Sequence, residues 1–440
     1  MDLVSDPVSD HACRFVPSYL LRRVSPGSLA VDGAHRGRRT ALLLEGRSVV
    51  APGGPAWTVH SADHDTTLPG RAVRAAGQRA SGDVAVDEAA DGITAALALF
   101  ADVYGRASYD GRGAPVTLTV HYGQDYDNAF WNGVQLVFGD GDGKIFERFT
   151  RPVDVLGHEL THAVTEHTAG LRYQDQSGAL NESVSDVFAS CLKQRLLGQS
   201  PDEADWLIGA GIFAPGVRAR ALRDMAAPGT AYDDPVLGRD PQVGHLDDYV
   251  ETADDNGGVH INSGIPNRAF QLAAVAVGGT SWEGAGRIWY AALTGGDVRA
   301  DTDFAGFAAA TVAVAGEHAD DVRQAWAAVG VLSAGGVVGG GAGTGVGAAG
   351  VAGDRVVSVR RSGGFAGLGV DGTIDLAGDD PRAPELAALL DRVDLGAVPG
   401  GDPQPDRYVY DLDLCGARCR VPEQHLTPDL ARIVELVLGG

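Results

Sequence analysis

The sequence predicts an α+β fold: a two-lobed body with a cleft, then a small α+β domain on a Gly-rich linker. Three observations lead to this prediction. Strand-like alternation dominates residues 51–153, helical periodicity dominates residues 154–331, and 10 glycines between Gly335 and Gly353 precede a third region, residues 355–440. A β-rich region followed by a helical one is typical of an α+β arrangement. A chain of 440 residues is also too long for one ordinary hydrophobic core.

The first segment, residues 1–50, stands apart in composition and predicts a short propeptide or an exposed arm. It contains the Arg-rich stretch GAHRGRRT and is followed by the loop signal APGGPAW. Its opening letters are acidic and lack the apolar stretch of a secretory signal. We therefore expect a cytoplasmic protein or one that is exported by a non-standard route.

The elements of the two lobes follow from the spacing of apolar residues. Apolar residues recur at helical spacing between Ala85 and Val103. PVTLTVHYG alternates as a strand does, and GVQLVFGDGDGKIF is typical of a strand, a Gly-Asp turn and a second strand. Five helices are expected in the second lobe, at residues 154–169, 178–197, 261–279, 284–296 and 301–331.

The C-terminal region has its own sequence of elements. Residues 332–354 are rich in glycine and predict a flexible linker. RVVSVRRSGGFAGLGVDGTIDL predicts strands, APELAALLDRV a helix and DRYVYDLDLCGARCRVPE a hairpin. TPDLARIVELVLG predicts a last helix that Thr427 caps.

Charge and composition exclude several classes of partner. The net charge is −23, so phosphate backbones and anionic lipid surfaces are repelled. The longest uncharged run, Val331 to Gly353, is mostly Gly and Ala and is a poor membrane span. The chain has four cysteines, too few for a disulfide framework, and we expect free thiols.

The stretch VLGHELTHAVTEHTAGL contains the motif HExxH. On a helix, His158 and His162 lie on one face and can bind one zinc ion, with Glu159 beside the metal as a base for bound water. A catalytic zinc needs a third protein ligand and an open position. Glu182 on the next helix is the candidate, and Asp186, one turn further on, can hold the other ring N–H of a ligating histidine.

The longer zinc motif that supplies a third histidine does not fit this sequence. The longer pattern HExxHxxGxxH fails because Thr165 and Thr168 replace its Gly and last His, and we expect His167 to lie at the surface. A further histidine, His260, follows in DDNGGVHINSG, where it can stabilise an oxyanion with Asp255 as its orienting carboxylate.

Three long motifs resemble the thermolysin family of zinc metalloproteases: HELTHAVTEHTAGLRYQDQSGALNESVSD, YDNAFWNGVQLVFGDGDG and DNGGVHINSGIPNRAF. The resemblance covers roughly residues 57–331. It implies a two-lobed peptidase with a single catalytic zinc at the base of the cleft, acting on peptide or protein substrates. The implied zinc ligands are His158, His162 and Glu182.

The same resemblance implies roles for the residues around the metal. Glu159 is the general base, and His260 and Tyr173 stabilise the oxyanion. Asp255 orients His260, and Asp186 supports His158. The residues implied in binding the substrate backbone, or lying near it, are Asn128, Ala129, Trp131 and Arg223.

The resemblance also implies an apolar pocket for the residue after the scissile bond. Its walls are Phe146, Phe149, Val155 and Leu222. All four are apolar, so we expect cleavage before Leu, Phe or similar residues. Phe149 is bulkier than the usual leucine and narrows the pocket.

Large secreted members of this family hold paired calcium ions, and this chain departs from that pattern. Asp154 matches one of the acids, but Lys193 stands where a glutamate is expected, and DWLIGAG from Asp205 lacks the other glutamates. A lysine ammonium near Asp154 would replace calcium's charge. We therefore expect the paired calcium site to be absent.

Two further resemblances concern the ends of the chain. CRFVPSYLLRRV resembles the start of the protealysin-like branch, which has short propeptides, so residues 1–50 are expected to cover the cleft until they are cleaved. Cys13 either places a thiolate on the zinc or is a small packed residue; in the second case Cys13→Ser leaves latency unchanged. RRSGGFAG, PDRYVYDL and TPDLARIVEL resemble emfourin, an inhibitor of such proteases, so residues 355–440 act as a tethered inhibitor or as a stabilising or docking appendage.

Three functional hypotheses remain open. The first is a zinc endopeptidase, expected to be a monomer and to be controlled by its own propeptide and C-terminal domain. The second is a protease fold that its tail permanently blocks and that serves recognition. The third is another zinc hydrolase on the same helix, such as an aminopeptidase. The intact Glu159 and Glu182 favour the first, and the segments NAFW and DNGGVH argue against the third.

Overall fold

The computed structural model describes residues 13–31, 56–332 and parts of 356–439. The rest of the expected propeptide and the Gly-rich linker lie outside these residues. The chain divides into two compact units, residues 1–337 and 338–440. Within the described residues, none of the helices combines the length and apolar character needed to cross a bilayer.

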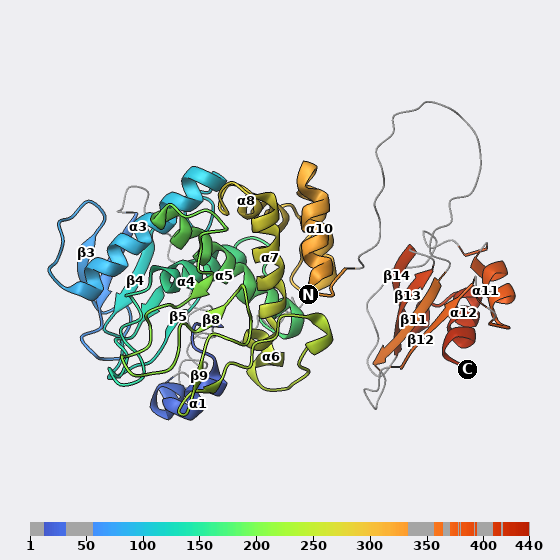
Figure 1. Ribbon diagram of the computed structural model, residues 1–440, viewed down its shortest axis with the longest axis horizontal. Coiled ribbons are helices and arrows are strands. Elements are labelled where there is room, and N and C mark those ends of the chain that lie inside the picture. The colour runs from blue at the N-terminus through green and yellow to red at the C-terminus, as the bar shows by residue number, and fades with distance from the viewer. Residues whose placement is uncertain are drawn as a thin grey trace, which may run out of the picture. The chain divides into compact units, whose positions relative to one another are not determined.

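A mixed 6-stranded sheet forms the first lobe of unit 1, in the order β1-β5-β6-β4-β2-β3 (Figure 1). β4 runs parallel to β2 and to β6, whereas β1 and β3 pair antiparallel at the two edges. Without β1, β5 would be the edge strand of the sheet. Its free edge can pair with a short extended segment, and β1 is that segment. The strands are β1 (Cys13–Arg14), β2 (Trp57–Ser61), β3 (Arg71–Ala75), β4 (Val116–Val120), β5 (Ala129–Trp131) and β6 (Leu136–Phe138).

The helix α3 (Val84–Tyr104) covers this sheet and has clear start and stop signals. Asp83 accepts hydrogen bonds from the backbone N–H groups of Ala85 and Val86, and Gly105 ends the helix in the left-handed conformation. The apolar face expected between Ala85 and Val103 is buried against the sheet and α4.

The second lobe is helical, as expected, with short strands between its helices (Figure 1). The short strands are β7 (Leu207–Ile208), β8 (Arg223–Asp224), β9 (Asp233–Asp234) and β10 (Gly238–Arg239). The helices are α4 (Val153–Glu166), α5 (Asp175–Leu197), α6 (Asp255–Asn262), α7 (Gly264–Val277), α8 (Ala285–Thr294), α9 (Phe304–Val314) and α10 (Ala319–Ala328).

One expectation about this lobe was wrong. Residues 301–331 are two helices, not one, because the chain breaks at Gly316, whose φ is 58°. The 3-10 turn Gly316–His318 joins them, and Trp326 then packs back against Trp289 with ring centroids 5.9 Å apart. The break lets α10 fold onto the core instead of leaving it.

The described part of residues 1–50 continues from β1 into α1 (Ser18–Val24), which lies beside β9 (Figure 1). Arg23 Nη1 donates to the carbonyl oxygen of Leu237 at 3.2 Å. Phe15, Leu20 and Leu21 are fully buried in the same apolar cluster as the two lobes. The described part of residues 1–50 is therefore packed into the core of unit 1.

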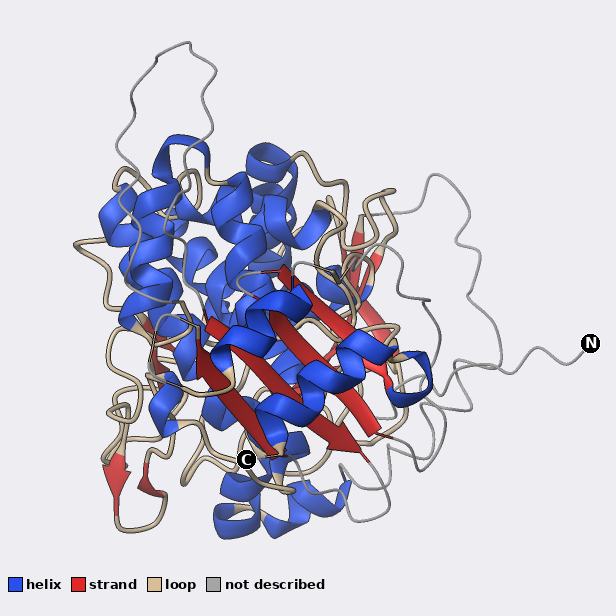
Figure 2. Ribbon diagram, turned by 90° about the vertical axis from the view of Figure 1, so that its right-hand side faces the viewer, coloured by secondary structure: helices blue, strands red, loops and turns tan. Residues whose placement is uncertain are grey.

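Unit 2 has a separate core and its own sheet, with two helices lying across one face (Figure 2). The sheet is antiparallel in the order β12-β11-β13-β14. The expected hairpin is β13 and β14, and Thr427 caps the last helix by accepting from the N–H of Leu430. The elements are β11 (Val356–Gly363), β12 (Val370–Asp375), α11 (Ala383–Leu390), β13 (Tyr408–Leu414), β14 (Ala417–Pro422) and α12 (Pro428–Leu438).

Candidate metal centre

The HExxH motif lies in the middle of α4, where His158, Glu159 and His162 are buried. The two imidazoles are four residues apart on one face, and their Nε2 atoms lie 2.9 Å from each other. α5 brings Glu182 to the same point, with Oε2 at 3.4 Å from His158 Nε2 and Oε1 at 3.5 Å from His162 Nε2.

A glycine makes this close approach of α4 and α5 possible. A Cβ at Gly157 would lie 3.0 Å from a methyl of Leu192 and 3.2 Å from the backbone Cα of Ala189. The residue before the first histidine therefore lets the helix backbones approach closely enough for three ligand atoms to meet.

These residues fit a zinc ion. Ligand atoms on a tetrahedral zinc, with bonds of about 2.0–2.1 Å, are about 3.3 Å apart. The two Nε2 atoms are 2.9 Å apart, and each lies 3.4–3.5 Å from one of the two oxygens of Glu182, so the three side chains surround a space of about this size. The fully buried Oε2 of Glu182 has no hydrogen bond within the described residues, which is costly unless a cation binds it.

The second nitrogen of each histidine is held by a buried partner. His158 Nδ1 lies 2.9 Å from Asp186 Oδ1, and His162 Nδ1 lies 2.8 Å from Asn181 Oδ1. With the proton on Nδ1, each ring points the lone pair of Nε2 at the metal position. Asn181 was not predicted from the sequence, because an asparagine on a helix has no signal of its own.

Asp186 is the centre of a larger buried network. Arg223 donates to both of its oxygens, from Nε and Nη2, each at 2.7 Å. Asn267, which was also not predicted, donates to Oδ2 at 2.8 Å. Burial opposes ionisation, but the charge of Arg223 and the bond from His158 lower the pKa of Asp186 to about 2.

Two glutamates at the centre have opposite electrostatic environments. Burial raises the pKa of Glu159 to about 8 in the metal-free site, and neither of its oxygens has a hydrogen bond within the described residues. Burial also opposes the ionisation of Glu182, but the charges of His260 and His158 hold its pKa well below the usual range. Glu182 thus suits a permanent ligand and Glu159 a group that takes up a proton.

His260 and Tyr173 stand on the other side of the metal ligands. His260 Nδ1 lies 2.7 Å from Asp255 Oδ1, and its backbone N–H donates to Asp255 Oδ2 at 3.0 Å. Asp255 and Asn256 have φ values of 55° and 52°, so the carboxylate is presented by a left-handed turn. The hydroxyl of Tyr173 donates to Glu182 and lies 3.3 Å from His260 Nε2.

Residues 14–16 lie in the cleft beside these groups, along β5. Phe15 N–H donates to the carbonyl oxygen of Ala129 at 3.1 Å. Val16 N–H donates to Asn128 Oδ1 at 2.9 Å, and Asn128 Nδ2 donates to Val16 O at 3.3 Å. The predicted backbone-binding residues Asn128 and Ala129 thus contact a peptide of this chain. Trp131, by contrast, uses its indole to donate to Glu166 at 2.8 Å.

The carbonyl groups of Arg14 and Phe15 face away from β5, toward His260 and Arg223. Arg14 O accepts from His260 Nε2 at 2.9 Å, and Phe15 O accepts from Arg223 Nη1 at 3.2 Å. Arg223 therefore joins Asp186 to the cleft peptide. The sequence did not predict this role for Arg14 and Phe15, although the stretch CRFVPSYLL was recognised as part of the propeptide.

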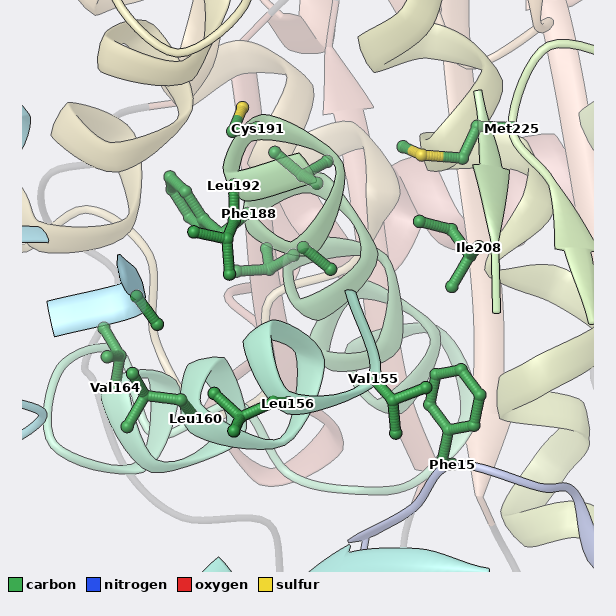
Figure 3. Packing of buried hydrophobic residues seen from close by; sticks show 14 of the residues in the cluster. Phe15, Val155, Leu156, Leu160, Val164, Phe188, Cys191, Leu192, Ile208 and Met225 are labelled. Atoms are coloured by element: carbon green, nitrogen blue, oxygen red, sulfur yellow. The ribbon is translucent and has the colours of Figure 1, made fainter. Parts of the chain in front are cut away.

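The ring of Phe15 is fully buried in an apolar pocket next to the metal ligands. It packs edge-on against His158 at 5.3 Å, with the Arg223 guanidinium 4.9 Å from its centroid. Figure 3 shows the ring next to Val155. Gly209, not predicted, leaves space for it: a Cβ there would lie 3.2 Å from the Phe15 ring and 3.3 Å from Leu222 Cβ.

The other two predicted wall residues belong to the same buried cluster as Phe15. Phe146 and Phe149 are fully buried, with ring centroids 5.7 Å apart. The side chain of Cys13 lies outside the described residues, although its backbone pairs with Trp131 in β1. The thiolate hypothesis for Cys13 therefore stays a prediction.

The site combines two imidazoles and a carboxylate with a second buried glutamate, and a peptide of this chain is bound beside them. This combination defines the class of metallohydrolases that act on peptides. Comparison with known families agrees. Residues 57–166 match the thermolysin metallopeptidase catalytic domain, residues 169–331 match the thermolysin metallopeptidase alpha-helical domain, and residues 359–438 match emfourin.

Named relatives point the same way. An extracellular metalloprotease of Pectobacterium carotovorum subsp. carotovorum is 50% identical over 335 residues, which cover 72% of this chain and 96% of that protein. A thermolysin of Alicyclobacillus acidocaldarius subsp. acidocaldarius is 43% identical over 246 residues, covering 53% and 42%. The solved structure of the precursor of protealysin, a metalloproteinase from Serratia proteamaculans, matches with a TM-score of 0.66 at 50% identity, covering 73% of this chain and 100% of that one.

The chain therefore belongs to the thermolysin family of zinc-dependent metallopeptidases, with an emfourin domain at its C-terminal end.

Asp186→Asn is expected to weaken zinc binding by about 10–100-fold, because a neutral amide is a weaker acceptor for the ring N–H of His158 than a carboxylate and because Arg223 loses its charge partner. Competition with a zinc chelator measures the affinity, with circular dichroism to show that the variant is folded. Asp234→Asn is the matched control, since Asp234 is also buried but caps a turn at Val236. Equal zinc affinity in both variants would contradict this role of Asp186.

Proposed function

We propose that this chain is a zinc endopeptidase that hydrolyses the bond before a large hydrophobic residue, and that residues 1–50 keep it latent as a propeptide. The way in which the Arg14–Phe15 peptide is bound supports this proposal most. The carbonyl of Arg14 accepts from His260, while the next side chain fills the apolar pocket beside His158. A substrate bound in the same way would have its scissile bond next to Glu159.

The proposed roles of the side chains follow from their environments. Bound zinc supplies a Lewis acid for the substrate carbonyl and for water. Glu159, with no hydrogen bond to its oxygens among the described residues, takes the proton of the attacking water and passes it to the leaving nitrogen. His260 donates from Nε2 to the oxygen that gains negative charge, and Asp255 keeps His260 in place. The hydroxyl of Tyr173 donates to the same oxygen when a bound zinc takes the place of its proton at Glu182.

The proposed specificity follows from the shape and chemistry of the pocket. Phe15 is fully buried there among apolar side chains, with only the guanidinium of Arg223 over its face. Burying a phenylalanine or leucine contributes about 1.5–3 kcal/mol, whereas a charged side chain would lose its hydration. Large hydrophobic residues are therefore favoured after the scissile bond.

The proposed latency follows from the same contacts. Residues 14–16 use the backbone partners that a substrate needs, namely Asn128, Ala129 and Arg223. A substrate can bind only after this segment has left. We further propose that the enzyme is monomeric. We also propose that it is exported, and the support is that the Pectobacterium relative is named an extracellular metalloprotease.

Phe15→Ala in the full chain is expected to raise the initial rate at least about tenfold on a quenched peptide with Phe or Leu after the scissile bond. The reason is that truncating a buried phenylalanine costs about 3–5 kcal/mol and loosens the propeptide. Ala30→Ser, an exposed change in the same segment, is the control. Adding Glu159→Gln to Phe15→Ala should abolish the activity and keep the zinc. Equal rates for wild type and Phe15→Ala would contradict this form of latency.

We propose that residues 355–440 restrain the protease as a tethered inhibitor. The support is the emfourin match over residues 359–438 and a core separate from that of unit 1. A flexible linker of the predicted length would give an effective concentration on the order of millimolar. Even a weak inhibitor would then be bound most of the time.

A chain that ends at Val331 tests this second restraint, because unit 1 contains its own complete hydrophobic cluster. After removal of residues 1–50 from both forms, the shorter chain is expected to cleave the quenched peptide faster than the longer one. A zinc chelator should stop both. Equal rates would give the C-terminal domain another role, and no cleavage by either would favour a binding protein.

We propose that Lys193 replaces the paired calcium ions. Its ammonium lies 4.0 Å from Asp154 Oδ2, 2.7 Å from Asp205 Oδ1 and 3.0 Å from the carbonyl of Leu207. Burial raises the pKa of Asp154 to about 6, and Lys193 opposes that rise. A cation is thus already supplied by the chain.

The melting temperature of the zinc-loaded protein is therefore expected to be the same with millimolar calcium and with a calcium-selective chelator. Differential scanning calorimetry measures it. Lys193→Ala should melt lower, because a buried carboxylate loses its cation. A higher melting temperature with calcium would show that this region binds the ion.

A further inference from the structure

A second cluster of metal-ligating side chains lies in the β-rich lobe, made of His64, His121 and Asp140. Each offers a ligand atom, and these atoms all lie within 4.8 Å of one another. The three residues come from the loop between β2 and β3, the end of β4, and the loop after β6. None of them belongs to the catalytic centre or to the propeptide contacts.

The distances within this cluster are near those of a metal site. His121 Nδ1 lies 2.8 Å and 3.0 Å from the two oxygens of Asp140, and His64 Nδ1 lies 3.5 Å from Asp140 Oδ2. Ligand atoms on a tetrahedral zinc are about 3.3 Å apart. The side chain of His64 is 54% exposed, so its ring can rotate to bring Nδ1 closer to a shared metal position without disturbing the core.

The second nitrogen of His121 is held as it is in protein metal sites. Nε2 lies 3.0 Å from Asp83 Oδ2, and Asp83 is itself fixed as the cap of α3. At 2.8 Å from Asp140 Oδ2, Nδ1 donates a hydrogen bond, and a divalent cation would displace that proton while Asp83 keeps the proton on Nε2. This arrangement matches that of His158 and Asp186 at the catalytic centre.

The backbone is already arranged to hold the cluster together. His64 N–H donates to the carbonyl of His121 at 2.9 Å, and Tyr122 N–H donates to Phe138 O at 3.2 Å. His64 and His121 have φ values of 65° and 52°, an unusual conformation for residues other than glycine. The approach of these loops therefore does not depend on side-chain contacts alone.

Charge and access also favour a cation. Asp83, Asp140 and Asp63 surround the two histidines, and Arg71, 3.2 Å from Asp63, is the cation that lines the adjoining pocket of about 280 Å³. That pocket is lined by His64, His121 and Asp83, so solvent can reach the metal position and complete its coordination.

We propose that His64, His121 and Asp140 bind a divalent transition metal, with Zn²⁺ as the best match to two imidazoles and one carboxylate. Such an ion joins the β2–β3 loop to the ends of β4 and β6. It stabilises the lobe whose edge strand β5 lines the cleft. The site is independent of the catalytic zinc and of the proposed function.

The test is a titration of the full chain, loaded with one equivalent of zinc, with further Zn²⁺ by isothermal calorimetry. A second equivalent is expected to bind and to raise the melting temperature. His64→Ala and Asp140→Asn should each weaken this second binding by more than about tenfold and remove the rise in melting temperature. His318→Ala, a change of a partly exposed histidine on another surface, is the matched control and should bind as wild type does.

Two outcomes would overturn the proposal. One is that the wild type takes up no second equivalent. The other is that the second equivalent binds His64→Ala as tightly as it binds wild type, which would put the ion elsewhere on the surface. Zinc content of the one-equivalent form and peptidase activity after propeptide removal report on the catalytic centre separately.

Discussion

The buried ion pair between Asp186 and Arg223 joins the two halves of the active site. Asp186 orients the zinc ligand His158, and Arg223 reaches from the same carboxylate to the carbonyl of Phe15 in the cleft. Both side chains are almost completely buried, so each charge depends on the other for compensation. Metal geometry and peptide binding are thus coupled through two hydrogen bonds of 2.7 Å.

Around this pair, several buried polar groups have hydrogen-bond partners, and the carboxylates of the candidate metal centre include oxygens that have none within the described residues. Asn181 and Asn267 complete the partners of His162 and Asp186. The oxygens left without hydrogen bonds in this region include both of Glu159 and one of Glu182. Unsatisfied buried carboxylates are costly, and they persist where a ligand or a reaction uses them. The paired asparagine and histidine groups position the site, whereas the unpaired oxygens of Glu159 and Glu182 remain available to a metal or to a reacting water.

The sequence predicted much of this because local spacing determines it. HExxH on a helix places two imidazoles together, and Glu182 and Asp186 lie one turn apart on the next helix. The resemblance of long motifs supplied Arg223, Asn128 and the pocket walls. The helix at residues 85–103 was predicted from the spacing of its apolar residues alone, and the structure adds the cap at Asp83 and the final Gly105.

What the sequence did not predict depends on contacts between distant segments. Phe15 meets His158 only because β1 pairs with β5, and no local pattern indicates which propeptide residue fills the pocket. The break at Gly316 was missed because alanine-rich helical spacing continues on both sides of it. His64, His121 and Asp140 belong to three separate loops, so their proximity could not be predicted from spacing.

The central claim is that His158, His162 and Glu182 hold one zinc ion. X-ray absorption at the zinc edge, on protein loaded with one equivalent, tests it most directly. The account predicts a shell of nitrogen and oxygen at about 2.0–2.2 Å with the features of two imidazole rings. It also predicts the loss of one ring from that shell in His162→Ala. A spectrum without imidazole features, or one that His162→Ala leaves unchanged, would contradict the assignment.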